Sequence, residues 1–116
     1  MLFTLRGCET AVPFLEKSGA GAIVVVGSAA AVEVGVLSSR GAYGSVKATI
    51  LPYIKVLARD LAAKNVRANV VSPGMVYFKG GVWNLVEQNM PDRYRQALDL
   101  NPMGRMGTPE EVANAV

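Results

Sequence analysis

The sequence predicts an α/β fold built around a parallel sheet, and three observations carry that prediction. A helical pattern over residues 2–17 precedes a short β-branched run at 22–26. A second, longer helical pattern over 43–64 precedes a second predicted buried strand at 66–71. Helices and strands that alternate in this way are typical of parallel sheets. We therefore expect about two neighbouring parallel strands with flanking helices.

The first helix is predicted from apolar residues at helical spacing, such as Leu2, Leu5 and Val12. It should end at the glycine-containing turn of residues 18–21. On this helix Cys8 is expected to be a buried, small apolar residue. The run at 22–26 is continuous and β-branched, which is typical of a strand buried on both faces of a parallel sheet.

The second helix is predicted as one long element from Tyr43 to Lys64, closed by Asn65. Pro52 lies inside it and cannot donate a backbone hydrogen bond to Ala48, so a bend is expected there. The strand that follows, at 66–71, should stop abruptly at the sequence Ser-Pro-Gly of residues 72–74.

Beyond residue 74 the pattern becomes short amphipathic pieces at 81–88 and 91–100. A closing helix is signalled by Thr108 as N-cap, Pro109 at the first helical position and Glu111 three residues after the cap. We expect this helix to continue to the end of the chain. Two strands cannot form a parallel sheet covered on both faces, so the chain is interpreted as a piece of a larger fold.

Composition narrows the possible functions. The 116 residues are 51% hydrophobic and 18% charged, which suits one packed domain whose surface is partly covered. The net charge of +3 is not gathered into a basic run, so nucleic acid is not expected as a partner. A single cysteine and no histidine exclude an internal disulfide, a Cys/His zinc site and a histidine-based triad. Arg6 and Glu9 interrupt the first apolar segment, so we expect neither export nor a membrane span and predict a cytoplasmic protein.

Tyr43 and Lys47 are the first candidate catalytic residues, because side chains four positions apart on a helix emerge on one face. A free phenol ionises only near pH 10, outside the range useful for acid-base catalysis. An ammonium about 4 Å away favours the phenolate by ~4 kcal/mol at an effective dielectric constant of about 20. Such a tyrosine can exchange a proton with an alcohol or ketone oxygen. The alternative is a boundary tyrosine beside a solvated lysine.

Ser28 and the pair Pro73-Gly74 follow the two predicted strands directly. The carboxyl ends of parallel strands meet at one edge of the sheet, where α/β proteins bind their ligands. Both features also have a purely structural interpretation, as a turn former and as a break after a strand.

Four segments resemble the second half of a classical short-chain dehydrogenase/reductase: GAIVVVGSAA, GAYGSVKAT, NVRANVVSPG and NPMGRMGTPEEVA, in this order and spacing. The resemblance covers nearly the whole chain. It implies a partial Rossmann-type doubly wound sheet, with the glycine-rich phosphate-binding turn belonging upstream of residue 1. Residues 1–116 would then be an incomplete NAD(P)-binding domain, with residues 75–107 as a substrate lid.

The same resemblance implies the roles of the site residues. Tyr43 is the acid-base group, Lys47 favours its ionised form and holds the nicotinamide ribose, and Ser28 bonds the substrate oxygen. The cofactor contacts would be Tyr43, Lys47, Pro73, Gly74 and Val76. No metal is expected, and the cofactor is NAD or NADP, undecided between the two.

Several positions depart from the family pattern. Gly27 stands where a second hydroxyl residue is usual, and a longer loop makes Ser38 and Ser39 rivals of Ser28. Phe78 stands where a threonine often binds the carboxamide. The Met and aromatic residues between 75 and 106 are interpreted either as lining for an apolar alcohol or ketone or as core.

The sequence therefore predicts an NAD(P)-dependent oxidoreductase that transfers hydride between nicotinamide and an alcohol or ketone. The parent enzyme is expected to form homo-oligomers through helix 43–64. One alternative is a truncated, non-catalytic fragment or oligomerisation module. Another is a relative that epimerises or dehydrates nucleotide sugars, which shares the Tyr-x-x-x-Lys spacing.

Overall fold

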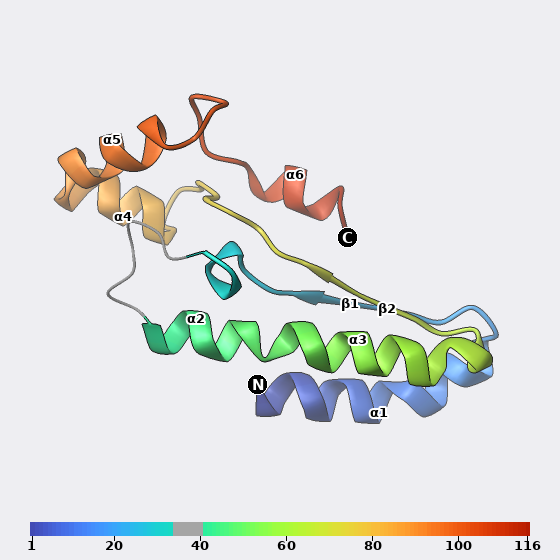
Figure 1. Ribbon diagram of the computed structural model, residues 1–116. Coiled ribbons are helices and arrows are strands. Elements are labelled where there is room, and N and C mark those ends of the chain that lie inside the picture. The colour runs from blue at the N-terminus through green and yellow to red at the C-terminus, as the bar shows by residue number, and fades with distance from the viewer. Residues whose placement is uncertain (34–40) are drawn as a thin grey trace. The chain divides into compact units, whose positions relative to one another are not determined.

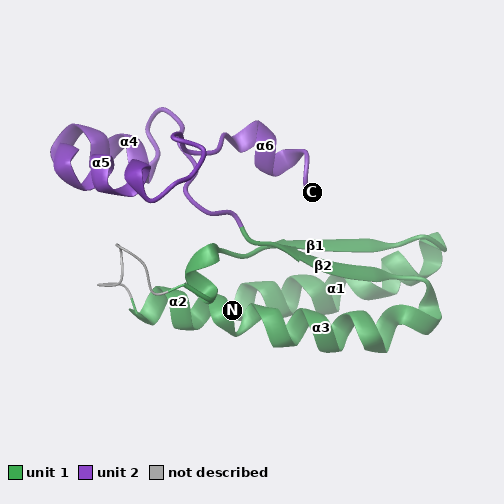
Figure 2. Ribbon diagram, turned by 45° about the horizontal axis from the view of Figure 1, so that its top comes forward, with its two compact units in different colours: residues 1–72 green, residues 73–116 purple. Residues whose placement is uncertain are grey.

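The computed structural model describes residues 1–33 and 41–116 (Figure 1). The chain forms two compact units, residues 1–72 and residues 73–116 (Figure 2). The first unit, called unit 1, contains α1 (Leu2–Ser18), β1 (Ala22–Val26), η1 (Ala29–Ala31), α2 (Gly41–Ala48), α3 (Ile50–Leu61), η3 (Ala62–Lys64) and β2 (Arg67–Val71). The second, unit 2, contains α4 (Val82–Asn89), α5 (Pro91–Asp99) and α6 (Pro109–Ala113). The predicted order of helices and strands is confirmed.

In unit 1, β1 and β2 form a parallel two-stranded sheet in which Ala22 pairs with Arg67 and Val26 with Val71. Helices α1 and α3 lie on the same face of this sheet (Figures 1 and 2). The core between them consists of Cys8, Ile50, Ile54 and Ala68, with Ile23, Val25 and Val70 packed against it. Alternate strand residues therefore face the helices, as the pleat of a strand requires. The expected burial of Cys8, which is 5% exposed, is confirmed.

The prediction that β1 is buried on both faces is wrong for the described part of unit 1. Ala22 is exposed and Val26 retains 50% of its accessible surface. The physical reason is that α1 and α3 cover the same face, so the opposite face of these two strands has no packing partner within the described part of unit 1. The continuous apolar run is nevertheless the pattern of a strand that is covered on both sides.

The ends of the two long helical segments are joined in space. Gly19 ends α1 in the left-handed conformation at φ 73°, and Asn65 closes the second segment at φ 55°. The Asn65 side-chain amide donates to the Gly19 carbonyl oxygen, and Lys64 forms an ion pair with Glu16 at 2.6 Å. Both predicted helix ends are confirmed, and they stabilise each other.

The predicted long helix is interrupted where Pro52 disturbs it. Helix α2 ends at Ala48, Thr49 forms a turn, and α3 begins at Ile50. The carbonyl of Ala48 lies four residues before Pro52 and loses the N–H that would otherwise pair with it. The Thr49 hydroxyl donates to the Val46 carbonyl at 2.7 Å and helps to close the last turn of α2.

The buried apolar residues described in unit 2 are Trp83, Val86, Ala97 and Met106. A parallel bridge between Val76 and Gly107 joins its first and last segments. The predicted capping box of α6 is confirmed, since Thr108 accepts from the N–H of Glu111 and Glu111 accepts from that of Thr108. The prediction that this helix continues to the chain end is wrong. It ends at Ala113, and the N–H groups of Ala115 and Val116 bond to the carbonyl three residues back, as in a 3₁₀ turn.

Among the described residues, no helix is both long enough and apolar enough to cross a membrane.

Candidate active site

Ser28 lies at the carboxyl end of β1. The backbone N–H of Gly27 donates to the Val71 carbonyl at 2.8 Å, which extends the strand pairing by one residue. Ser28 itself is extended, with φ −168° and ψ 144°, and its hydroxyl oxygen accepts from the N–H of Ala30 at 3.2 Å. The serine therefore does cap a turn, as its structural interpretation proposed. Its hydroxyl hydrogen can still be donated to a ligand.

Lys47 connects α2 to the same strand end. Its ammonium donates to the carbonyl oxygen of Val26 at 3.2 Å, across 21 positions of sequence. The same nitrogen lies 5.9 Å from the centre of the Tyr43 ring, within the range of cation–π attraction. Tyr43 is 48% exposed, so its phenol is accessible to a ligand. Lys47 is thus anchored between a strand end and the tyrosine.

Gly44, which the sequence analysis did not single out, sets how closely α2 approaches η1. A Cβ atom on Gly44 would lie 2.6 Å from the carbonyl oxygen of Ala30, a distance that no side chain could occupy without a shift of the backbone. The contact joins the helix that carries Tyr43 and Lys47 to the turn that Ser28 caps. The signal in the sequence was a glycine inside a helical pattern, which costs stability unless packing requires it.

Unit 1 therefore brings the elements that carry Ser28, Tyr43 and Lys47 together at the carboxyl end of β1. The group offers a hydroxyl donor, a phenol and an ammonium, which suits proton exchange with an alcohol or carbonyl oxygen. The rival residues Ser38 and Ser39 lie outside the described residues.

The other predicted cofactor contacts, Pro73, Gly74 and Val76, belong to unit 2. Gly74 is exposed, and a Cβ atom there would meet nothing within 4 Å. Val76 forms the bridge to Gly107 described above. Their role as nicotinamide contacts stays a prediction.

The Met and aromatic residues of unit 2 divide between the two interpretations given for them. Trp83 and Met106 are buried, whereas Phe78 and Met103 are 52% and 69% exposed. The Phe78 ring lies over Gly81, where a Cβ atom would come within 2.8 Å of the ring carbons. The assignment of residues 75–107 as a lid stays a prediction.

Tyr77 is held by polar contacts inside unit 2. Its hydroxyl donates to a Glu87 carboxylate oxygen at 2.5 Å and accepts from the side-chain amide of Asn84 at 2.9 Å. The hydrogen bond to Glu87 raises the pKa of Tyr77, with a smaller contribution from desolvation. The ring of Tyr94 packs edge-on against that of Tyr77 at 6.1 Å between centroids. These contacts tie the segment after Gly74 to α4 and α5.

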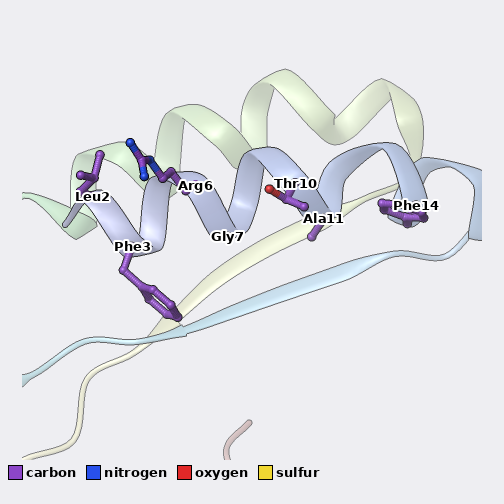
Figure 3. A pocket seen from close by; sticks show the side chains of 7 residues that line it. All are labelled: Leu2, Phe3, Arg6, Gly7, Thr10, Ala11 and Phe14. Atoms are coloured by element: carbon purple, nitrogen blue, oxygen red, sulfur yellow. The ribbon is translucent and has the colours of Figure 1, made fainter.

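A shallow, open hollow lies along α1 (Figure 3). Its lining is mostly apolar and contains none of the predicted site residues; it consists of Leu2, Phe3, Arg6, Gly7, Thr10, Ala11 and Phe14.

Comparison with protein families gives a match over residues 4–116 to a family described as enoyl-(acyl carrier protein) reductase. Among curated relatives, the chain is 38% identical over 106 residues to isoepoxydon dehydrogenase from Penicillium expansum, covering 91% of the chain and 40% of the relative. It is 34% identical over 113 residues to cyclohexanol dehydrogenase from Rhodococcus sp. (strain TK6), covering 97% of the chain and 40% of that protein.

Solved structures of oxidoreductases also match the chain. An oxidoreductase of the short-chain dehydrogenase/reductase family from Burkholderia thailandensis matches with a TM-score of 0.80 and 33% identity, over 94% of this chain and 41% of that one. A 3-oxoacyl (acyl-carrier-protein) reductase from Agrobacterium tumefaciens C58, solved with NADP bound, matches with a TM-score of 0.77 and 31% identity, over 93% and 41%. The chain thus spans about 40% of the length of the proteins it matches.

Proposed function

Because the chain belongs to the short-chain dehydrogenase/reductase family of oxidoreductases, we propose that its protein transfers hydride between a nicotinamide cofactor and an alcohol or ketone. The observation that carries this proposal is the joint anchoring of Lys47 on Val26 and over the Tyr43 ring, beside the turn that Ser28 caps. This arrangement gives a proton donor and a hydroxyl donor at the carboxyl ends of the strands, where α/β folds bind ligands.

The proposed roles follow from the chemistry of each side chain. Tyr43 gives a proton to the substrate oxygen during reduction and takes one back during oxidation. Lys47 places a positive charge beside the Tyr43 ring and can bond the ribose of the cofactor, and Ser28 donates a hydrogen bond to the same substrate oxygen. All three groups act on oxygen, so a carbonyl or carbinol carbon is the reacting centre.

The residues of unit 1 fit the ribose and ring end of a nicotinamide cofactor, since the Lys47 ammonium can donate to sugar hydroxyls. Bound there, the cofactor would supply or accept the hydride. The sequence of this chain contains no glycine-rich turn of the Gly-x-Gly-x-x-Gly kind at the start of a helix, so the pyrophosphate is not assigned to its residues. The NADP bound to the Agrobacterium tumefaciens reductase supports a nicotinamide cofactor without deciding between NAD and NADP.

The proposal is tested by Tyr43→Phe in the protein at its natural length, with cyclohexanol and NAD⁺ or NADP⁺ as reactants. The variant keeps the ring but loses the proton that is exchanged, so turnover should fall by about 10²-fold or more. Because Tyr43 is half-exposed, the unfolding midpoint should stay close to that of the wild type. Retained turnover in Tyr43→Phe would disprove the assigned role.

A second candidate function is oligomerisation through residues 43–64. It is supported by Val46 and Val56, which are 50% and 49% exposed on α2 and α3. Large exposed apolar patches mark protein interfaces, and we propose that Val46 and Val56 belong to such a patch. Oligomerisation does not require catalysis, so this function also applies to a chain that has no enzymatic activity.

A further inference from the structure

A second serine hydroxyl lies at the strand end that carries the candidate site. A Cβ atom on Gly27 would come within 2.8 Å of the Ser72 hydroxyl oxygen and 2.9 Å of a Val70 methyl carbon. The Ser72 hydroxyl therefore occupies the space beside Gly27 that a side chain at position 27 would need. Gly27 comes directly between Val26, whose carbonyl accepts from Lys47, and Ser28.

The strand geometry indicates on which face this hydroxyl lies. Ala68 and Val70 of β2 belong to the core on the face that carries α1 and α3. Side chains two positions apart on an extended chain point to the same face, so Ser72 continues this row beyond the end of β2. Helix α2, with Tyr43 and Lys47, is continuous with α3 except for the turn at Thr49.

Ser72 also has the capacity to bind a ligand. It is exposed, and its hydroxyl has no hydrogen-bond partner among the residues that the structure describes. A hydroxyl can donate one hydrogen bond and accept others. Ser28, by contrast, already uses its oxygen to cap η1.

We propose that Ser72 is a further substrate-binding residue, which donates a hydrogen bond to the substrate oxygen beside Ser28 and owes its position to the absence of a side chain at Gly27. The inference rests on the proposed function. Two hydroxyl donors from the ends of two paired strands would hold the oxygen on which negative charge develops during reduction. Ser72 thereby helps to fix which carbon receives the hydride.

The first experiment compares Ser72→Ala with Ser18→Ala in the protein at its natural length. Ser18 is a matched control because it is an exposed serine at the end of α1. With cyclohexanol as substrate, kcat/KM should fall about three- to tenfold in Ser72→Ala, the usual value of one hydrogen bond. The loss should appear in kcat if the bond strengthens in the transition state. An unchanged kcat/KM with an active wild type would overturn the role of Ser72 and leave the proposed function intact.

The second experiment does not depend on turnover. Ser72→Cys introduces a thiol at the site, while Cys8, being buried, contributes little background to labelling by a thiol reagent. At constant cofactor, added cyclohexanol should slow labelling of Ser72→Cys and leave labelling of Ser18→Cys unchanged. If cyclohexanol slows labelling of Ser72→Cys in a protein that shows no turnover, binding at Ser72 is supported although the proposed function fails. Equal labelling with and without cyclohexanol would overturn the inference.

Discussion

The Lys47 ammonium lies 5.9 Å from the centre of the Tyr43 ring while it donates a hydrogen bond to the Val26 carbonyl oxygen at 3.2 Å. The lysine therefore joins a helix to the end of a strand, which a freely solvated side chain does not do. A single ammonium therefore makes two contributions, a positive charge beside the Tyr43 ring and a hydrogen bond between α2 and the end of β1.

Replacement of Lys47 should abolish both contributions. Lys47→Met keeps the length of the stem but removes the charge and the hydrogen bond to Val26, so turnover should fall by about 10²-fold or more. Lys47→Arg keeps the positive charge, but the planar guanidinium group does not have the shape of the compact ammonium. This variant should therefore keep only part of the wild-type activity. In steady-state kinetics, turnover should be highest in the wild type, lower in Lys47→Arg and lowest in Lys47→Met. Equal activity of all three proteins would contradict it.

Gly44 and Gly41 provide a matched pair within α2. Gly44→Ala brings a Cβ atom 2.6 Å from the Ala30 carbonyl oxygen, so α2 must move away from η1, at a cost of about 1–3 kcal/mol in unfolding free energy. Gly41→Ala, at the first residue of α2, meets nothing within 4 Å, so it should change the unfolding free energy little. Urea unfolding followed by circular dichroism should show a clear loss of stability for Gly44→Ala alone. Equal shifts would show that the approach of α2 to Ala30 is not close.

The stability of unit 2 should depend on acidic pH through Glu111. Its carboxylate accepts two hydrogen bonds from Arg105, at 2.6 and 2.9 Å, and one from the N–H of Thr108. The Arg105 hydrogen bonds, followed by that of Thr108, lower the pKa of Glu111 to about 2 from its ordinary value of 4.5. A lowered pKa in the folded state means that the contribution is complete above pH 4.5 and is lost as the pH falls towards 2.

The measurement is the unfolding temperature of wild type and Glu111→Gln between pH 7 and pH 2. The variant lacks the charge, so it should unfold at a lower temperature at neutral pH. The difference between the two proteins should shrink as the pH falls below 4.5. A difference that does not change with pH would mean that the ion pair contributes nothing.

Val56 tests the oligomerisation proposal. Its side chain is 49% exposed on α3, so Val56→Lys should be tolerated within the monomer and should place a charge in any interface formed by this helix. Sedimentation should then show a smaller species than the wild type. Lys55→Ala, next to it and also exposed, serves as the control. Oligomers that persist in Val56→Lys would exclude this part of the segment from the interface.

The sequence by itself determined the order of the elements and most of their limits, because these depend on local chemistry. The segments 22–26 and 66–71 correspond to β1 and β2, Gly19 and Asn65 end helices through left-handed backbone, and Thr108 with Glu111 caps α6. The spacing of Tyr43 and Lys47 on one helical face also follows from helix geometry alone.

Only the tertiary structure decided which distant part of the chain each residue of the candidate site contacts. The bond from Lys47 to Val26, the approach of Gly44 to Ala30 and the position of the Ser72 hydroxyl beside Gly27 all join residues distant in sequence. Periodicity describes one element at a time, whereas such contacts depend on how closely two elements pack. The exposed face of β1 has the same explanation. The apolar pattern of a strand shows which faces can be buried, but the neighbouring elements decide which face is covered.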